Sequence, residues 1–414
     1  MRRSPIGTIA VATACALAFA FTVPPAALAQ YGKSNWGQIL IAGGRERNTD
    51  EDTIDNSVDL YDPASNRFAP EIATTQMKER MRATATLLDT GPNAGKVLIA
   101  GGDNRNGVQR TSTELYDPAT NAVADGPAMK SPRSGHTATV IPSGPNAGKI
   151  LFAGGMGADG GELASTELYD PATNKFFPGP TMRAGCSVCT ATVIMSGKNA
   201  GNILIAGSDD SRSQKALLEL YDSPVNEFIL GPRTNIRGVY SATAIASGKN
   251  AGKVLILGGI DTTGQEALAL TGLYDPGANT FAPGPSVKNI RERHTATVIT
   301  SGPGAGRILI AGGGNWHDHP SLASTELYDP GSNVFSPGPS MSTGRAGHTA
   351  TVIISGKNTG KILIAGGVNS DGVNPVATLS STELYDPATN TFAPGPKMNL
   401  ARADAVAVQL PPAP

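Results

Sequence analysis

Charge, aromatic side chains and cysteine are all scarce in this sequence of 414 residues. Charged residues make up 16% of it and aromatic residues 5%, and there are three cysteines and five histidines. Helical bundles and coiled coils, which need abundant Glu and Lys and few helix breakers, are therefore excluded. Disorder is disfavoured as well, because 39% of the residues are hydrophobic and the net charge is only −1. The same near-neutral charge gives no general attraction to nucleic acid.

Long hydrophobic runs are absent beyond the first thirty residues, so the remaining chain contains no candidate membrane span. The N-terminal segment begins with Arg2 and Arg3, continues with an apolar run over 6–21, and ends in the small-x-small pattern of 27–29. This order is typical of a secretory signal peptide. We predict a signal peptide at residues 1–29 and export to the periplasm or the extracellular space. Cys15 leaves a lipoprotein anchor open as an alternative.

Common catalytic signatures are also missing. The chain has no Gly-x-Ser-x-Gly elbow, no phosphate-binding Gly-x-x-x-x-Gly-Lys-Ser/Thr loop and no His-Glu-x-x-His metalloprotease motif. These absences favour a binding protein over an enzyme.

Glycine and proline, by contrast, are abundant, with 50 and 31 residues, and they follow an internal repeat. A Tyr-Asp pair, usually followed by Pro, recurs every 52 to 57 residues. The seven tyrosines are Tyr61, Tyr116, Tyr169, Tyr221, Tyr274, Tyr328 and Tyr385. A Gly doublet at the end of an apolar run recurs in step, as at 101–102 and 366–367. Seven such units account for residues 30–414 as a single domain.

Each unit is predicted to contain four short strands. In the last unit these are 348–353, 361–367, 381–385 and a strand beginning at Phe392, separated by turn-forming Gly, Pro and Asn residues. An Asn stands five residues after every repeat tyrosine, where we expect the left-handed conformation of a tight turn.

Four-stranded units with Gly doublets and a tyrosine followed by an aromatic residue resemble the kelch repeat, which implies an all-β, seven-bladed β-propeller. The chain begins at the second strand of a unit and ends with the strand-like segment 405–410. We therefore predict that this last segment completes the first blade and closes the ring.

The connections that differ between units join the second to the third strand, and they share one face with the connections between blades. Variable loops on a repeated scaffold commonly carry binding. The inter-blade connections also carry an aligned arginine in six units: Arg80, Arg133, Arg237, Arg291, Arg345 and Arg402. We predict an arginine ring at the mouth of the central channel that binds an anion. Pairing with acidic residues of the blades is the structural alternative. Some kelch proteins grip acidic peptides with arginines at this position.

Three residues after that arginine, three units carry a histidine. His294 and His348 belong to this column, and His317 and His319 occur in a variable loop of the same face. Converging imidazoles can bind copper. The column resembles the position of a copper ligand in the galactose-oxidase propeller, although the tyrosine that precedes the histidine there is absent here. Our prediction is that no cofactor is bound, with copper as the alternative.

Cys186 and Cys189 replace the arginine and the histidine of one unit. In an oxidising compartment they could form a disulfide if the chain turns between them, or they could remain free thiols. Taken together, the sequence predicts an exported, monomeric, non-enzymatic binding module. Its ligand would be a protein, a carbohydrate or an acidic small molecule. The alternative is an enzyme of galactose-oxidase or sugar-mutarotase type acting at the channel mouth.

Overall fold

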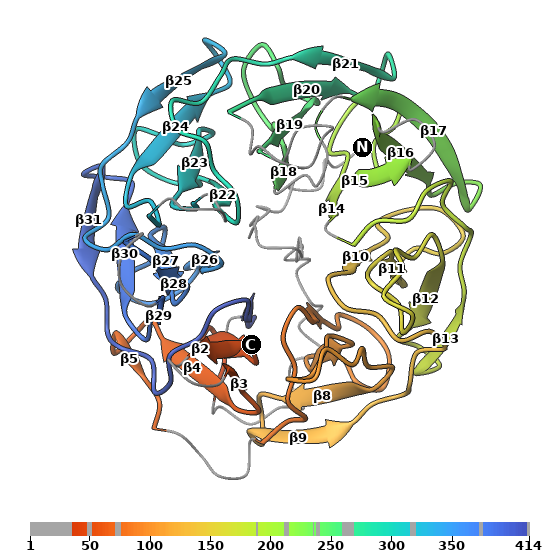
Figure 1. The fold of residues 1–414 in the computed structure, drawn as a ribbon, viewed down its shortest axis with the longest axis horizontal. Coiled ribbons are helices and arrows are strands. Elements are labelled where there is room, and N and C mark those ends of the chain that lie inside the picture. Colours follow the sequence, from red (N-terminus) through yellow and green to blue (C-terminus); the bar gives the residue numbers. More distant parts are fainter. Residues whose placement is uncertain are drawn as a thin grey trace, which may run out of the picture.

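Seven four-stranded antiparallel sheets form a closed ring in the computed structural model of the chain (Figure 1). The structure describes residues 35–47, 52–70, 76–187, 189–210, 215–234, 236, 241–258, 269–314, 320–371 and 376–411. Each sheet is a blade whose first strand, strand A, lies next to the central channel and whose last strand, strand D, lies at the rim. The predicted seven-bladed propeller is confirmed.

Blades are numbered here from the one that contains the first described strand. Blade 1 comprises β32 (Val406–Gln409), β1 (Ile39–Ala42), β4 (Val58–Asp62) and β5 (Arg67–Phe68). Blade 2 comprises β6 (Thr84–Leu87), β7 (Val97–Ala100), β8 (Thr113–Asp117) and β9 (Ala122–Asp125). Blade 3 comprises β10 (Thr137–Val140), β11 (Ile150–Ala153), β12 (Thr166–Asp170) and β13 (Lys175–Pro178). Blade 4 comprises β14 (Thr190–Val193), β15 (Ile203–Asp210), β16 (Lys215–Asp222) and β17 (Glu227–Thr234).

The remaining blades follow the same order. Blade 5 comprises β18 (Ser241–Ala244), β19 (Val254–Leu257), β20 (Thr271–Asp275) and β21 (Thr280–Pro283). Blade 6 comprises β22 (Thr295–Val298), β23 (Ile308–Ala311), β24 (Thr325–Asp329) and β25 (Val334–Pro337). Blade 7 comprises β26 (Thr349–Val352), β27 (Ile362–Ala365), β30 (Thr382–Asp386) and β31 (Thr391–Pro394).

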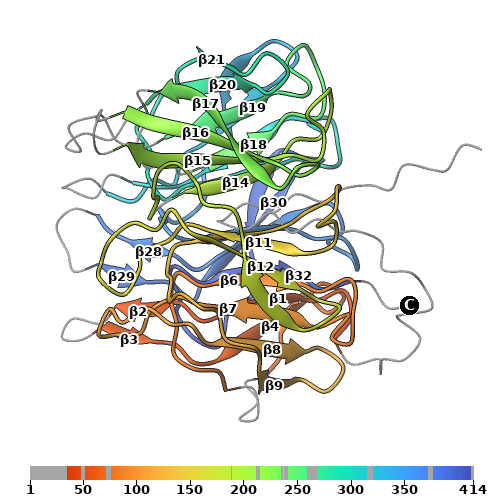
Figure 2. The same ribbon diagram turned by 90° about the vertical axis from the view of Figure 1, so that its right-hand side faces the viewer.

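Two short hairpins extend the connections between strands B and C. They are β2 (Arg45–Arg47) with β3 (Asp52–Ile54) in blade 1, and β28 (Val368–Asn369) with β29 (Ala377–Thr378) in blade 7. Figure 2 shows both hairpins protruding on the same side of the ring. We call this side the B–C face and the opposite side the A–B face.

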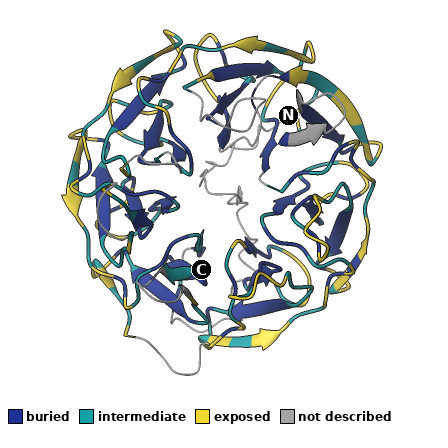
Figure 3. Cartoon of the chain, in the orientation of Figure 1, coloured by how far each residue is buried: buried dark blue, intermediate teal, exposed yellow. Residues whose placement is uncertain are grey.

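The hydrophobic core lies between neighbouring blades. One cluster, for example, joins Leu151 and Ala153 of blade 3 to Val193, Ile203 and Ile205 of blade 4. Strands A, B and C are therefore buried, whereas the outermost strands are largely exposed (Figure 3). Short β-branched strands such as Thr-Ala-Thr-Val suit this arrangement because both of their faces are covered.

The C-terminal strand closes the ring as predicted. β32 pairs with β1 in antiparallel register, from Ile39 opposite Gln409 to Ala42 opposite Val406. A backbone hydrogen bond of 2.7 Å from the Gly37 amide to the Pro411 carbonyl holds the segments that flank these two strands side by side. The innermost strand of blade 1 therefore comes from the opposite end of the chain.

The repeat tyrosines link each blade to its own turn, and several of them also link it to the preceding blade. In all seven blades the tyrosine hydroxyl donates to the Asn five residues later, as Tyr61 does to Asn66 at 2.8 Å. These asparagines have φ between 52° and 61°, so the predicted left-handed turn is confirmed. Asn358 of blade 7 donates to the Tyr61 hydroxyl at 2.9 Å, and Asn250 of blade 5 makes the same contact with Tyr328.

The Gly doublets end strand B with two left-handed residues. Gly101 and Gly102 have φ of 62° and 86°, and a Cβ on Gly102 would lie 2.6 Å from the carbonyl oxygen of Met81. Only glycine fits there, because other residues add both a clash and backbone strain. Within the described ranges no helix is long and apolar enough to cross a membrane.

Candidate functional site

The predicted arginine ring lies inside the blades and not at the channel mouth. Five members are described, and all of them are at most 1% exposed. They are Arg80, Arg133, Arg291, Arg345 and Arg402. Arg237 lies outside the described residues. The placement at the mouth is thus corrected for these five, and none of them presents a guanidinium to a ligand.

Blade 7 shows what this buried column does. Arg345 Nη1 donates to the carbonyl oxygens of Gly366 and Ser381, at 2.8 and 3.1 Å, and Arg345 Nη2 donates to Glu383 at 3.0 Å. Glu383 in turn accepts the backbone amide of Ser342 at 2.7 Å. The Gly366 carbonyl lies just beyond the end of β27, and a guanidinium has enough donors to reach it together with the Ser381 carbonyl and a carboxylate. These arginines therefore pair with acidic residues inside the blades, which was the alternative to the predicted anion-binding ring.

Blades 4 and 5 break the pattern. In blade 4, Glu219 is buried and accepts the amides of Arg183 and Ala184 at 2.7 and 3.1 Å, but Cys186 stands where the arginine would be. Burial raises the pKa of Glu219. In blade 5 the carboxylate position is Gly272, and the ring of the neighbouring Phe281 occupies the space where its side chain would begin.

The histidine column is also buried and joins adjacent blades. His136, His294 and His348 each bring Nε2 to a hydroxyl on the first residue of the preceding strand A, at 3.0, 2.8 and 3.0 Å. In His294, Nδ1 lies 3.3 Å from the Arg291 carbonyl, so Nδ1 carries the hydrogen and Nε2 accepts from Ser241. Burial lowers the pKa of His294 to about 3.

These contacts leave the copper alternative without support from the described histidines. His294 and His348 each serve their own inter-blade hydrogen bond. No group of three His, Cys, Asp or Glu side chains in the described part of the chain is arranged to hold a metal ion. His317 and His319 lie outside the described residues, so their position stays a prediction.

Cys186 and Cys189 form a disulfide in the structure, with their Cα atoms 5.7 Å apart. Cysteines three residues apart can form a disulfide only if the chain turns between them, and this Cα distance meets that condition. Both cysteines are fully buried against the blade 3 core, where Gly154 packs against Cys186. The disulfide therefore occupies the interior space that Arg and His take in other blades.

The channel mouth on the B–C face is formed by a different residue column, two positions after the buried arginine. A belt of backbone hydrogen bonds runs along it: Gly347 donates to Arg293, Asp404 to Gly347, Arg82 to Asp404, and Gly135 to Arg82, at 2.8 to 3.4 Å. All five residues are left-handed, with φ between 52° and 64°. Glycine adopts this conformation freely, whereas the backbone of Arg and Asp is strained in it.

Charged side chains from three blades converge on this belt. Arg293 of blade 6 reaches past blade 7 to form an ion pair with Asp404 of blade 1, and Arg45 Nε lies 3.2 Å from the same carboxylate. Arg82 of blade 2 pairs with the buried Asp103, its Nε lying 3.2 Å from Asp103 Oδ1. We call these five residues the rim cluster.

The electrostatics of the rim cluster keep its acidic centre ionised. Burial alone would raise the pKa of Asp404, but the guanidinium groups of Arg293, Arg45 and Arg82 hold that pKa below its usual value. The Arg82 side chain is the accessible member, with 41% exposure. Its Nη1 donates no hydrogen bond to any residue that the structure describes. An incoming anion can therefore meet this guanidinium without displacing a protein partner.

Sequence reasoning missed the rim cluster because it searched for residues that recur. The belt column reads Arg82, Gly135, Arg293, Gly347 and Asp404 in the described blades, with no one residue type common to all of them. The signal that could have found the cluster is a departure from the repeat: charged residues stand in a column where other blades have glycine. Such departures from a local rule are typical of functional positions.

Comparison with known proteins agrees with this architecture. The kelch motif matches residues 300–342 and 358–399. Kelch-like protein 33 of Homo sapiens is 26% identical over 138 residues, which cover 33% of this chain and 23% of that protein. The match thus spans about a quarter of that curated relative. The solved structure titled "Structure of YjhT" superposes with a TM-score of 0.53 at 13% identity, covering 76% of this chain and 97% of that one.

Seven four-stranded blades around a channel define the class as a β-propeller. With the recurring Tyr-Asp turns, the Gly doublets and the kelch motif matched at residues 300–342 and 358–399, the chain is a β-propeller that contains kelch repeats.

Proposed function

We propose that this propeller is a non-enzymatic binding module that takes an acidic ligand at the rim cluster. The observation that carries the proposal is the left-handed backbone of Arg82, Arg293 and Asp404 in a column where Gly135 and Gly347 meet the same requirement without strain. A left-handed non-glycine residue costs about 1 to 3 kcal/mol. Strain of this kind clusters at ligand sites, because the side chains are needed there for another purpose.

The arrangement suits a carboxylate or a phosphate. Guanidinium groups bind such anions through two parallel N–H donors, and a fixed group loses little entropy on binding. Arg293 and Arg45 are fixed by Asp404, and Arg82 is fixed by Asp103. Acidic peptides and acidic sugars both carry this chemistry, so the proposed partner is a protein segment or a carbohydrate acid.

The test is calorimetric titration of the purified protein with a hexaglutamate peptide and with glucuronate. We expect at least one probe to bind, and we expect Arg82→Gln to weaken that binding at least tenfold, because a charge-assisted hydrogen bond contributes about 1.5 to 3 kcal/mol. Arg307→Gln is the matched control. Arg307 is 42% exposed and paired with Asp329, much like Arg82 with Asp103, but it precedes β23 on the A–B face.

Two results would contradict the proposal. One is that neither probe binds. The other is that Arg307→Gln weakens binding as much as Arg82→Gln, since the anion would then be attracted by general surface charge.

Export is part of the same proposal. Its support is the basic, apolar and small-x-small order of residues 1–29, together with a disulfide of the kind that persists in oxidising compartments. Expression of the full chain in a secreting host should yield a protein outside the cytoplasm that begins at Gln30. Retention of Met1 in a cytoplasmic product would count against export.

A further inference from the structure

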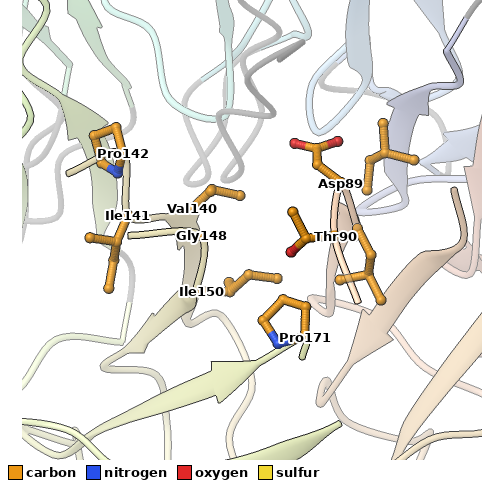
Figure 4. A pocket seen from close by; sticks show the side chains of 10 residues that line it. Asp89, Thr90, Val140, Ile141, Pro142, Gly148, Ile150 and Pro171 are labelled. Atoms are coloured by element: carbon orange, nitrogen blue, oxygen red, sulfur yellow. The ribbon is translucent and has the colours of Figure 1, made fainter. Parts of the chain in front are cut away.

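A pocket opens between blades 2 and 3 on the A–B face, at the opposite end of the ring from the rim cluster. It encloses about 230 Å³. Its walls come from the ends of β6 and β10, the start of β11 and the turn that holds Pro171. Figure 4 shows Asp89 and Thr90 on one side of the space and Ile141 and Pro142 on the other.

Nearly all of this lining is apolar. Leu87, Leu88, Val140 and Ile150 contribute hydrophobic side chains, and the only charged residue in the lining is Asp89. An engineered apolar cavity of about 150 Å³ is large enough to bind benzene. The pocket can therefore hold one small ring with a short substituent.

Asp89 is exceptional within the repeat. The same position, directly before the Ser or Thr of the A–B loop, is uncharged in the next five blades. The residues there are Pro142, Met195, Ala246, Thr300 and Ile354. The repeat therefore does not need a carboxylate at this point to form its loop.

The Asp89 carboxylate also lacks a partner. Its Oδ1 is buried without a hydrogen bond, and the described residues make no ion pair with it. Lys149, which adjoins the lining residue Gly148, instead contacts Asn146 and the ring of Phe177. A buried, unsatisfied carboxylate oxygen is costly, so such groups usually have a partner to meet. Burial raises the pKa of Asp89 to about 7.

We propose that this pocket binds a small organic cation, an apolar ring carrying an ammonium group, with the ring on the aliphatic wall and the ammonium on Asp89. The ring gains from burial against Leu87, Val140 and Ile150, and the ammonium supplies the donors that Asp89 lacks. The pocket is independent of the rim cluster because it lies on the other face and takes a ligand of opposite charge.

Benzylamine is a suitable probe, with toluene and benzyl alcohol as uncharged analogues of nearly the same shape. We expect benzylamine to bind the purified protein in calorimetry and to shift the methyl NMR signals of Val140, Ile141 and Ile150. Toluene should bind at least tenfold more weakly. Asp89→Asn keeps the shape of the side chain and should reduce benzylamine binding to the level of toluene.

The pH dependence provides a second readout. The lining residues other than Asp89 have no titratable side chains, and benzylamine stays protonated below pH 9, so Asp89 governs the effect. With a pKa of about 7, the ionised fraction of Asp89 falls on the order of fifty- to one-hundredfold between pH 8 and pH 5. Benzylamine affinity should fall with it in the native protein and stay level in Asp89→Asn.

Three outcomes would overturn the proposal. Equal binding of toluene and benzylamine would make the pocket a simple apolar cavity. Benzyl alcohol binding that strengthens at low pH would assign Asp89 as a protonated donor. Loss of benzylamine binding in Arg82→Gln with retention in Asp89→Asn would move the ligand to the other face. Arg82→Gln should otherwise leave benzylamine binding unchanged.

Discussion

Cys186 and Cys189 show how a single blade can replace an ion pair with a covalent bond. Elsewhere these two positions carry a buried arginine that reaches a glutamate, and a histidine that reaches the preceding blade. Blade 4 keeps the glutamate, Glu219, although no arginine is there to meet it. Blade 4 therefore has one half of the Arg–Glu pair that other blades carry.

Because Glu219 is present, the replacement of the Arg–Glu pair by a disulfide can be tested. Cys186→Ala/Cys189→Ala should lower the free energy of unfolding by about 2 kcal/mol, the entropy value for a closed loop of four residues. Cys186→Arg/Cys189→His should recover part of that loss, because the new arginine can pair with Glu219 and the new histidine can reach Thr137 at the start of β10. Urea unfolding at pH 7 measures all three proteins.

The informative quantity is the difference in the free energy of unfolding between the Ala/Ala variant and the Arg/His variant. If the Arg/His variant were no more stable than the Ala/Ala variant, the blade 4 interior would not have the geometry of the other blades. Repeating the urea unfolding of the native protein with a reductant gives the contribution of the disulfide alone.

At the scale of the element, the repeated features were predictable and the unrepeated ones were not. Strand order and the left-handed asparagines follow from patterns that recur in every unit, and ring closure follows from the additional strand-like segment 405–410. The connection before strand A was placed correctly, but the direction of its arginine was not. Alignment gives the position of Arg345 along the chain, whereas its inward direction is seen only from its hydrogen bonds to the carbonyl oxygens of Gly366 and Ser381.

The candidate sites were also predictable only as far as their residues recur. Repetition selects residues that pack, and both the arginine and the histidine columns proved to be packing elements in the described blades. The rim cluster and Asp89 depend on side chains that occur once, and no periodicity marks them. Their identification required the backbone torsions of the belt and the buried, unpartnered oxygen of Asp89.

The whole molecule is stabilised by closure of the ring. β32 and the residue that follows it place Val408 and Leu410 in the core between blades 1 and 2, and β32 covers the inner edge of β1. Burial of these two side chains alone contributes about 3 to 6 kcal/mol. Without the strand, β1 would expose an unpaired edge to the channel.

Deletion of residues 405–414 should therefore abolish the cooperative thermal transition or lower its midpoint by more than 10 °C, followed by circular dichroism. A circular permutant is the control, with residue 411 linked to residue 35 and new ends in the exposed loop at Arg105 and Asn106. It keeps β32 next to β1 and should melt close to the native protein. A truncated chain that melts like the permutant would contradict the role of closure.

The adjacency of Gly37 and Pro411 also offers a way to orient the molecule on a support. Gly37 and Pro411 meet at the end of β1 and β32 that lies on the A–B face, away from the hairpins of the B–C face (Figure 2). A tether attached at Gly37 or Pro411 would therefore leave the rim cluster facing outward. A surface coated through such a tether would present every copy with its channel mouth toward the solution.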